Sequence, residues 1–333
     1  MSAQPDSMSE AFAPAFAELL QGMHPLATAR TAVSPSGQLS AAACDLWTRL
    51  GLDGWLGIWE SDSREALAPE LLVFAEVAGR QALTLPFSFP ALLLPLLREQ
   101  SELVSFDWGG KAEDVVAGRV HPDTEGSPVL VDFFGPNGHY FDVAISNQSC
   151  EVRRIELTDS DVVPGLDACV PVAAVSADAV RSLAMAKFSV DSTRLCALLK
   201  PYMLFEYGQM VGSANAALDL AIAYARERRQ FGRAIGEFQA VKHALADAWI
   251  AVDNGRYALR ALMAMSDADA GMPFLISRCD RLVSESCRRA ARLAIQVHGG
   301  IGFAWEHDAH IYLKRIYKLA AKLRPLAHTL GAA

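Results

Sequence analysis

The stretch that decides the fold is ARERRQFGRAIGEFQ, residues 225–239. A helical pattern ends near Arg229, the chain turns through Gly232 and Gly236, and a new helical pattern begins at Glu237. The turn is basic, with four arginines inside eight residues: Arg226, Arg228, Arg229 and Arg233. Guanidinium groups beside a helix N-terminus suit a phosphate or diphosphate, because both supply directed N–H donors and positive potential. The alternative interpretation is a solvated, charged helix end.

A second informative stretch is QVHGGIGF, residues 296–303. It follows a long helical pattern over residues 273–297, and three of its residues are glycines within a span of four. Glycines let backbone amides approach a ligand closely, although many such loops are plain helix C-caps. The spacing is not GxGxxG and no strand pattern precedes it, which excludes a Rossmann dinucleotide fold.

Working outward, the chain divides into three regions of different pattern. Residues 1–102 contain short helical patterns at 11–23, 40–50 and 69–82. Residues 103–190 are rich in proline, glycine and β-branched residues, and predict a small, shortened antiparallel β-domain. Residues 191–333 predict a four-helix bundle, with long helices at 195–228, 237–266, 273–297 and 308–324. Helices and strands are segregated rather than alternating, so the predicted class is α+β, mostly α.

Composition excludes several classes of protein. The 333 residues include 38 acidic and 30 basic side chains, a net charge of −8, which argues against a nucleic-acid binder. Six scattered cysteines show no CxxC pair and no metal-ligand spacing with the histidines, so we expect reduced thiols and no metal site. The N-terminus does not resemble a signal peptide, and the apolar stretch 82–97 is interrupted by three prolines. A soluble, cytoplasmic protein without membrane insertion is expected.

The two stretches are most informative when they are taken together, in their order along the chain. RERRQFGRAIGEFQAVKHALAD at 226–247, followed by AIQVHGGIGFAWEHDAHIYLKR at 294–315, closely resembles the C-terminal domain of acyl-CoA dehydrogenases. The resemblance is strong over roughly residues 208–315, weaker at LVFAEVAGR (residues 72–80), and architectural only in the β-domain. It implies a helical domain, a β-domain and a four-helix bundle, with FAD at the interface of two subunits.

The resemblance also implies which residues hold the cofactor. Arg228 matches the arginine that pairs with the FAD diphosphate, and Gln230 and Phe231 match the residues beside it. Gln239 matches a glutamine that contacts the cofactor. The loop that closes over the adenosine-diphosphate half from the neighbouring subunit is matched by Gln296, Val297, His298, Gly299 and Gly300.

The reaction implied by the resemblance is α,β-dehydrogenation of an acyl-CoA thioester, with electron-transfer flavoprotein as the electron acceptor. A carboxylate removes the α-proton while the β-hydrogen leaves as hydride to the flavin. Hydrogen bonds that polarise the thioester carbonyl acidify the α-carbon, and a desolvated carboxylate is a stronger base.

The carboxylate is missing from the positions where the family keeps it. One position, counted from the double glycine, falls at Lys322 or Leu323, and no Glu or Asp lies between Ala309 and the last residue. The other, on the first helix of the bundle, falls at Tyr202. Glu206 lies one turn later on the same face, about 5.4 Å along the axis. It is our only candidate base, and a buried structural carboxylate is the alternative.

The β-domain also lacks the Thr-Glu-Pro and Trp-x-Thr-Asn-Gly type segments that hold the flavin ring and thioester. This combination resembles the short subunits of α2β2 bacterial enzymes that act on bulky, steroid-type acyl-CoA. Three hypotheses follow: a subunit that completes FAD binding in a heterotetramer, a self-sufficient homo-oligomeric dehydrogenase with a relocated base, and a non-redox binding protein on the same fold.

Overall fold

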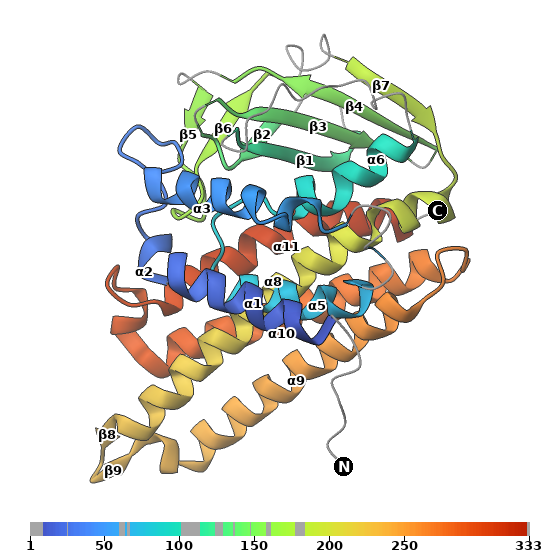
Figure 1. The fold of residues 1–333 in the computed structure, drawn as a ribbon. Helices are drawn as coiled ribbons and strands as arrows, with labels where there is room; N and C mark the ends of the chain where they lie inside the picture. Colours follow the sequence, from blue (N-terminus) through green and yellow to red (C-terminus); the bar gives the residue numbers. More distant parts are fainter. Residues whose placement is uncertain are drawn as a thin grey trace, which may run out of the picture.

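In the computed structural model, the described residues are 9–24, 26–59, 64, 67–100, 114–123, 129–135, 137–146, 148–157, 161–176 and 184–331. A layer of strands covers one side of a much larger assembly of helices (Figure 1). The predicted α+β, mostly helical fold is confirmed. The predicted boundary between residues 102 and 103 lies outside the described residues.

The N-terminal region is helical, as the spacing of its apolar residues predicts. Its elements are α1 (Ser9–Met23), α2 (Leu26–Ala29), α3 (Ala41–Leu52), η1 (Trp55–Gly57), η2 (Ala68–Glu70), α5 (Leu71–Arg80), η3 (Phe89–Leu93) and α6 (Leu94–Gln100). The Ser40 side chain caps α3 by accepting from the Ala43 amide, which satisfies one of the free N–H groups at the helix start. The buried aromatic rings of this region pack with those of α8, as at Phe87 and Phe205, whose centroids are 5.2 Å apart.

The strands of the middle region form two small sheets. One has the order β1 (Val116–Pro122), β3 (His139–Ile145), β4 (Ser149–Ile155), β7 (Ala184–Ser189), and the other has the order β2 (Val129–Asp132), β6 (Val172–Val175), β5 (Val162–Val163). All pairs are antiparallel except β1 and β3, which run parallel with Val120 opposite Val143. The parallel pair departs from the purely antiparallel sheet predicted, because β2 of the other sheet lies between these two strands in sequence.

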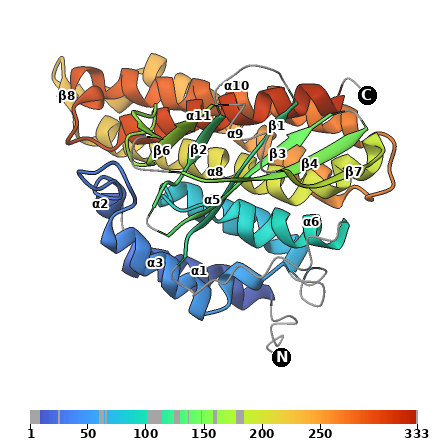
Figure 2. The same ribbon diagram turned by 90° about the horizontal axis from the view of Figure 1, so that it is seen from above.

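The C-terminal region contains the four long helices predicted, namely α8 (Ser192–Glu227), α9 (Gln239–Ala264), α10 (Met272–His298) and α11 (Ala309–Gly331). Helix α8 is buried on nearly all sides from Leu195 to Leu218, since it lies between α5 and the other C-terminal helices (Figure 2). One continuous apolar core contains residues of all three regions, such as Trp47, Phe141 and Met203. None of the helices in the described part of the chain is long and apolar enough to cross a membrane.

Helices α5 and α8 cross at very short range because glycines replace side chains at the contact. A Cβ atom on Gly212 would lie 2.1 Å from the carbonyl oxygen of Glu76, and one on Gly79 would lie 2.1 Å from that of Gln209. The Ser213 hydroxyl donates a hydrogen bond to the Gly79 carbonyl at 3.0 Å. The crossing therefore joins the N-terminal helices to α8 backbone against backbone.

We expect Gly212→Ala to lower the free energy of unfolding by about 1–3 kcal/mol, because the added methyl group forces the two helices apart. Chemical denaturation measures the effect. Gly22→Ala in α1 is the matched control, since a Cβ there meets no atom within 4 Å and the change should be neutral or mildly stabilising. Equal stability of both variants would contradict the close-packed crossing.

A buried histidine lies where the N-terminal helices meet the turn after α5. His24 is fully buried, and its Nε2 lies 3.4 Å from the Ala82 carbonyl oxygen and 3.5 Å from the Thr84 hydroxyl. Burial lowers the pKa of His24 to about 4, against the partial opposition of the Ala82 hydrogen bond. The fold therefore holds this imidazole neutral.

Acid should weaken the fold through this residue. The folded pKa of about 4 lies below the 6.5 of the unfolded chain, so protons bind the unfolded state more tightly and stability is lost as pH falls from 6.5 to 4. A shift of this size corresponds to roughly 3 kcal/mol. Urea titrations across this range should show a flatter pH dependence for His24→Leu than for the wild type. The exposed His328 serves as control, and His328→Gln should keep the wild-type slope.

Candidate functional site

The basic turn predicted from the sequence is a tight hairpin at the end of α8. Strands β8 (Arg229–Gln230) and β9 (Arg233–Ala234) pair antiparallel across Phe231 and Gly232. Both turn residues have positive φ, 52° and 81°, the signature of a type I′ turn. Phe231, at the tip of the hairpin, is 92% exposed.

The hairpin is held firmly against the helices. A Cβ on Gly236 would lie 2.9 Å from the carbonyl oxygen of Ala225, so glycine permits the close return of the chain onto α8. The Glu237 carboxylate accepts from the Ala234 amide at 3.2 Å, and the Arg233 guanidinium lies 4.2 Å from the centroid of the Phe238 ring. The predicted contact residues of this segment are exposed to solvent: Arg228, Gln230, Phe231 and Gln239.

The arginines of the turn carry uncompensated charge. Within the described part of the chain, no carboxylate forms an ion pair with Arg226, Arg228 or Arg229. This differs from Arg256 in the middle of α9, which is paired with Glu76 and Asp253. An exposed, unpaired cluster of guanidinium groups favours an anionic ligand.

The glycine loop lies at the same end of the helices. Helix α10 ends at His298, Gly299 has φ 66°, and a short turn η7 (Gly299–Phe303) follows. Added Cβ atoms on Gly299 and Gly300 would meet no atom within 4 Å, so the backbone is open on that side. Gln296, Gly299 and Gly300 are exposed, Val297 is half-buried and His298 is buried.

A ring contact brings the two segments together. The centroid of the His298 ring lies 4.7 Å from that of Tyr224, which is one helical turn before Arg228. Residues about seventy positions apart in the sequence therefore lie next to each other, as the resemblance implies. The combination of unpaired arginines and open glycine backbone suits the diphosphate of a dinucleotide. Among the described residues, no group of three His, Cys, Asp or Glu side chains is placed to hold a metal ion.

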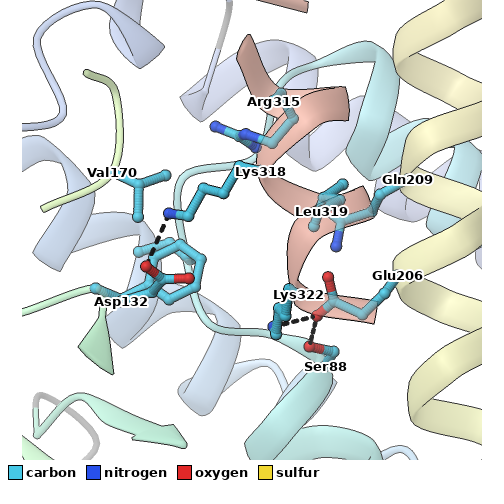
Figure 3. Close-up of a pocket in the computed structure, with 11 residues that line it drawn as sticks. Ser88, Asp132, Val170, Glu206, Gln209, Arg315, Lys318, Leu319 and Lys322 are labelled. Carbon is cyan, nitrogen blue, oxygen red and sulfur yellow. Dashed lines mark hydrogen bonds and ion pairs between the residues drawn. The ribbon is translucent and has the colours of Figure 1, made fainter. Parts of the chain in front are cut away.

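The candidate base lies in a separate pocket where α8 and α11 meet the β-domain (Figure 3). The pocket contains about 330 Å³ of space, part of it open to solvent. Its lining is mostly polar and charged, with Leu85, Ser88, Asp132, Phe133, Val170, Glu206, Gln209, Arg315, Lys318, Leu319 and Lys322.

The two positions at which the family keeps its base face each other in this region. The Lys322 ammonium lies 5.1 Å from the centroid of the Tyr202 ring and 3.1 Å from Oε1 of Glu206. Leu323, the other position counted from the double glycine, points into the core. The Ser88 hydroxyl also donates a hydrogen bond to Oε1 of Glu206. The carboxylate of the candidate base is therefore engaged by a cation and a hydroxyl.

Lys322 stays protonated in this position. Burial alone would lower the pKa of its ammonium group, but the attraction of Glu206, with a smaller contribution from Tyr202, raises that pKa above its ordinary value. The Lys322–Glu206 contact is therefore a true ion pair, and it is one of three along the same face of α11. Arg315 pairs with Asp167, and Lys318 lies 2.9 Å from Asp132.

Removal of one partner of the Lys322–Glu206 pair should destabilise the fold more than replacement of both partners by uncharged side chains. We expect Lys322→Met to lower the free energy of unfolding by about 3–5 kcal/mol, because a buried carboxylate loses its counter-ion. The Glu206→Gln, Lys322→Met double variant should recover most of that loss. Chemical denaturation of all four proteins gives the coupling energy. Additive effects of the two substitutions would show that the pair does not form.

Sequence reasoning missed Ser88, Gln209 and Lys318 as pocket residues. The signal for Lys318 was present, because Arg315, Lys318 and Lys322 recur at intervals of three and four residues and so share one face of a helix. No comparable signal marked Ser88, which reaches Glu206 from 118 residues away in the sequence.

Sequence comparisons agree with this architecture. Residues 206–325 match the family model of the acyl-CoA dehydrogenase C-terminal domain. The acyl-CoA dehydrogenase IpdE2 of Mycolicibacterium smegmatis is 28% identical over 205 residues, which cover 60% of this chain and 61% of that protein. IpdE2 of Mycobacterium tuberculosis is 40% identical over 115 residues, 34% of this chain and 35% of that protein. The matched stretches span less than two thirds of these curated relatives.

Structural comparison extends the likeness to nearly the whole chain. The ChsE4–ChsE5 complex from Mycobacterium tuberculosis includes a chain that superposes with a TM-score of 0.73 at 19% identity, covering 99% of this chain and 97% of that one. The FAD complex of PigA superposes with a TM-score of 0.72 at 18% identity, covering 100% and 98%. The fold is that of an acyl-CoA dehydrogenase. Within that fold, residues 206–325 match the acyl-CoA dehydrogenase C-terminal domain.

Proposed function

We propose that this chain is a subunit of an FAD-dependent acyl-CoA dehydrogenase that contributes the diphosphate half-site to a partner subunit. The observation that carries the proposal is the contrast between its two candidate sites. The arginine turn and the glycine loop are exposed, and no ion pair engages Arg228 among the described residues, whereas the pocket at the α11 face holds the candidate base Glu206 in an ion pair.

The exposed end has the donors that the FAD diphosphate needs. The Arg228 guanidinium supplies a planar fork of N–H donors, and Gly300 leaves space for phosphate oxygens beside the backbone. Gln230, Gln239 and Gln296 add amide groups at the rim. When bound, FAD accepts the β-hydrogen of an acyl-CoA as hydride. The FAD complex formed by PigA, a protein of the same fold, supports this assignment.

The contacts of Glu206 in the pocket support the proposal that catalysis requires a second subunit. α-Proton removal requires a carboxylate able to accept a proton, and Glu206 is bonded at Oε1 to both Lys322 and Ser88. A complementary subunit would provide the base and the flavin-ring site. The ChsE4–ChsE5 complex, of which one chain superposes on this one, is a precedent for such an assembly. Resemblance to the short subunits of enzymes for bulky, steroid-type thioesters points to a bulky acyl-CoA substrate, with electron-transfer flavoprotein as acceptor.

Arg228→Ala tests the half-site. Loss of charge-assisted hydrogen bonds to the diphosphate should weaken FAD binding about 10- to 100-fold in the assembly of this chain with its co-purifying partner. The measurement is the ratio of bound flavin to protein, followed by titration of the flavin-free protein with FAD. Arg260→Ala on α9 removes an equal charge from a surface outside the turn and should leave the affinity unchanged.

Two results would contradict the proposal. One is unchanged FAD affinity in Arg228→Ala. The other is a purified single chain that holds one FAD per subunit and turns over acyl-CoA without a partner, because a half-site subunit should retain flavin poorly alone and recover it on co-expression.

A self-sufficient dehydrogenase is the second candidate, favoured by the position of Glu206. Its carboxylate lines the pocket at 3% exposure, and Figure 3 shows one oxygen on the side of Gln209, away from Lys322 and Ser88. In that case the flavin of the isolated chain should bleach on addition of acyl-CoA, and Glu206→Gln should abolish bleaching. Bleaching that persists in Glu206→Gln would exclude Glu206 as the base.

A further inference from the structure

Three rings meet at the end of the C-terminal helices, beneath the glycine loop. The His298 ring lies between Tyr224, at 4.7 Å between centroids, and His307, at 4.2 Å. We call Tyr224, His298 and His307 the ring clip. Each ring comes from a different segment: the last turn of α8, the last residue of α10, and the turn before α11. Ring contacts at these distances contribute beyond the area that they bury.

Each residue of the ring clip is joined, by a hydrogen bond or a peptide bond, to the backbone of the candidate site or to the backbone next to it. The Tyr224 carbonyl accepts from the Arg228 amide at 2.8 Å, so the position of Tyr224 sets the start of the arginine turn. Gly299, the first residue of the glycine loop, follows His298 directly. Nδ1 of His307 accepts from the Ala309 amide at 3.1 Å and so fixes the start of α11.

His298 itself has little freedom to turn outward. Its Nδ1–H donates to the Ala294 carbonyl at 2.7 Å, one turn back in α10, and its side chain is buried. A Cβ on Gly302 would lie 3.1 Å from the His298 Cβ, so η7 folds closely over the residue. The imidazole is therefore directed into the protein, away from the surface on which Gln296, Gly299 and Gly300 are exposed.

The two imidazole rings can lie in contact because they are not both cations. Burial lowers the pKa of His307, and the neighbouring His298 lowers it further. A neutral imidazole also agrees with the hydrogen bond in which Nδ1 of His307 accepts rather than donates.

We infer that the ring clip sets the spacing between the arginine turn and the glycine loop, and that His298 is a positioning residue of the diphosphate site rather than a ligand contact. This inference rests on the proposed function of that site. A displacement of about 1 Å between two phosphate-binding segments is enough to spoil a bidentate contact.

Two spin labels test the spacing without any ligand. Glu227→Cys and Arg292→Cys place labels at exposed positions beside the turn and before the loop, with the partly exposed Cys44 replaced by Ser. Pulsed dipolar spectroscopy should give one narrow distance distribution for the labelled chain. His298→Ala should broaden or shift it, and His298→Phe, which keeps the ring, should restore it.

FAD titration of the chain assembled with its co-purifying partner gives the second readout. We expect His298→Ala and Tyr224→Ala to weaken FAD binding about five-fold each, and His298→Phe and Tyr224→Phe to stay close to the wild type. The double alanine variant should lose little more than either single one, because both remove the same contact. Leu259→Ala, a buried change in α9, controls for general loss of stability and should leave FAD affinity unchanged.

The outcomes separate the inference from the proposed function. An unchanged label distance in His298→Ala, or equal damage from His298→Phe and His298→Ala, overturns the clip. FAD affinity that tracks thermal stability across all variants, Leu259→Ala included, also overturns it. If Arg228→Ala weakens FAD binding while the clip variants do not, only the clip fails. If the clip variants change the distance but neither they nor Arg228→Ala change FAD affinity, the diphosphate site itself is refuted.

Discussion

The arrangement of the three regions depends on one buried guanidinium group. Arg315 of α11 is 3% exposed, pairs with the buried Asp167 of the β-domain, and donates to the Leu83 carbonyl at 2.6 Å in the turn after α5. A charge so deeply buried is tolerable only when all its donors are matched. Burial by itself would raise the pKa of Asp167, but the attraction of Arg315 and Lys318, together with the hydrogen bonds from Arg315 and the Cys169 amide, lowers that pKa. A single side chain thereby joins the C-terminal helices, the β-domain and the N-terminal helices.

The two ends of the C-terminal helices differ in how their charged side chains are paired. Near Arg315, the cationic face of α11 is tied by ion pairs to Asp132, Asp167 and Glu206, so the region is internally neutralised. At the far end, the arginine turn carries charge that no described carboxylate balances. Ion pairs neutralise the cationic groups near Arg315, whereas Arg226, Arg228 and Arg229 have no ion-pair partner among the described residues. The first surface therefore supports the fold, and the second is the candidate for binding an anion.

The turns of the candidate site could be predicted from the sequence, because glycines determine the backbone conformation within a few residues. The sequence predicts a turn through Gly232 and Gly236, and the chain turns at Phe231 and Gly232. Gly299 and Gly300 follow the helical pattern over residues 273–297, and α10 ends at His298. The role of His298 was not predictable from its neighbours. Its burial and its contact with Tyr224 depend on how α8 and α10 pack, and nothing in the local sequence encodes that pairing.

The sequence by itself determined the four long C-terminal helices, the basic turn and the glycine loop, because periodicity, glycine and charge act over a few residues. It also determined that no carboxylate occupies residues 202, 322 or 323. Tertiary structure alone decided the parallel pairing of β1 with β3, the approach of Ser88 to Glu206, and the use of Lys322 as the counter-ion. The β1–β3 pairing joins residues more than twenty positions apart, and the two contacts of Glu206 join residues more than a hundred positions apart. The contacts of Glu206 with Lys322 and Ser88 therefore follow from packing, not from its position in the sequence.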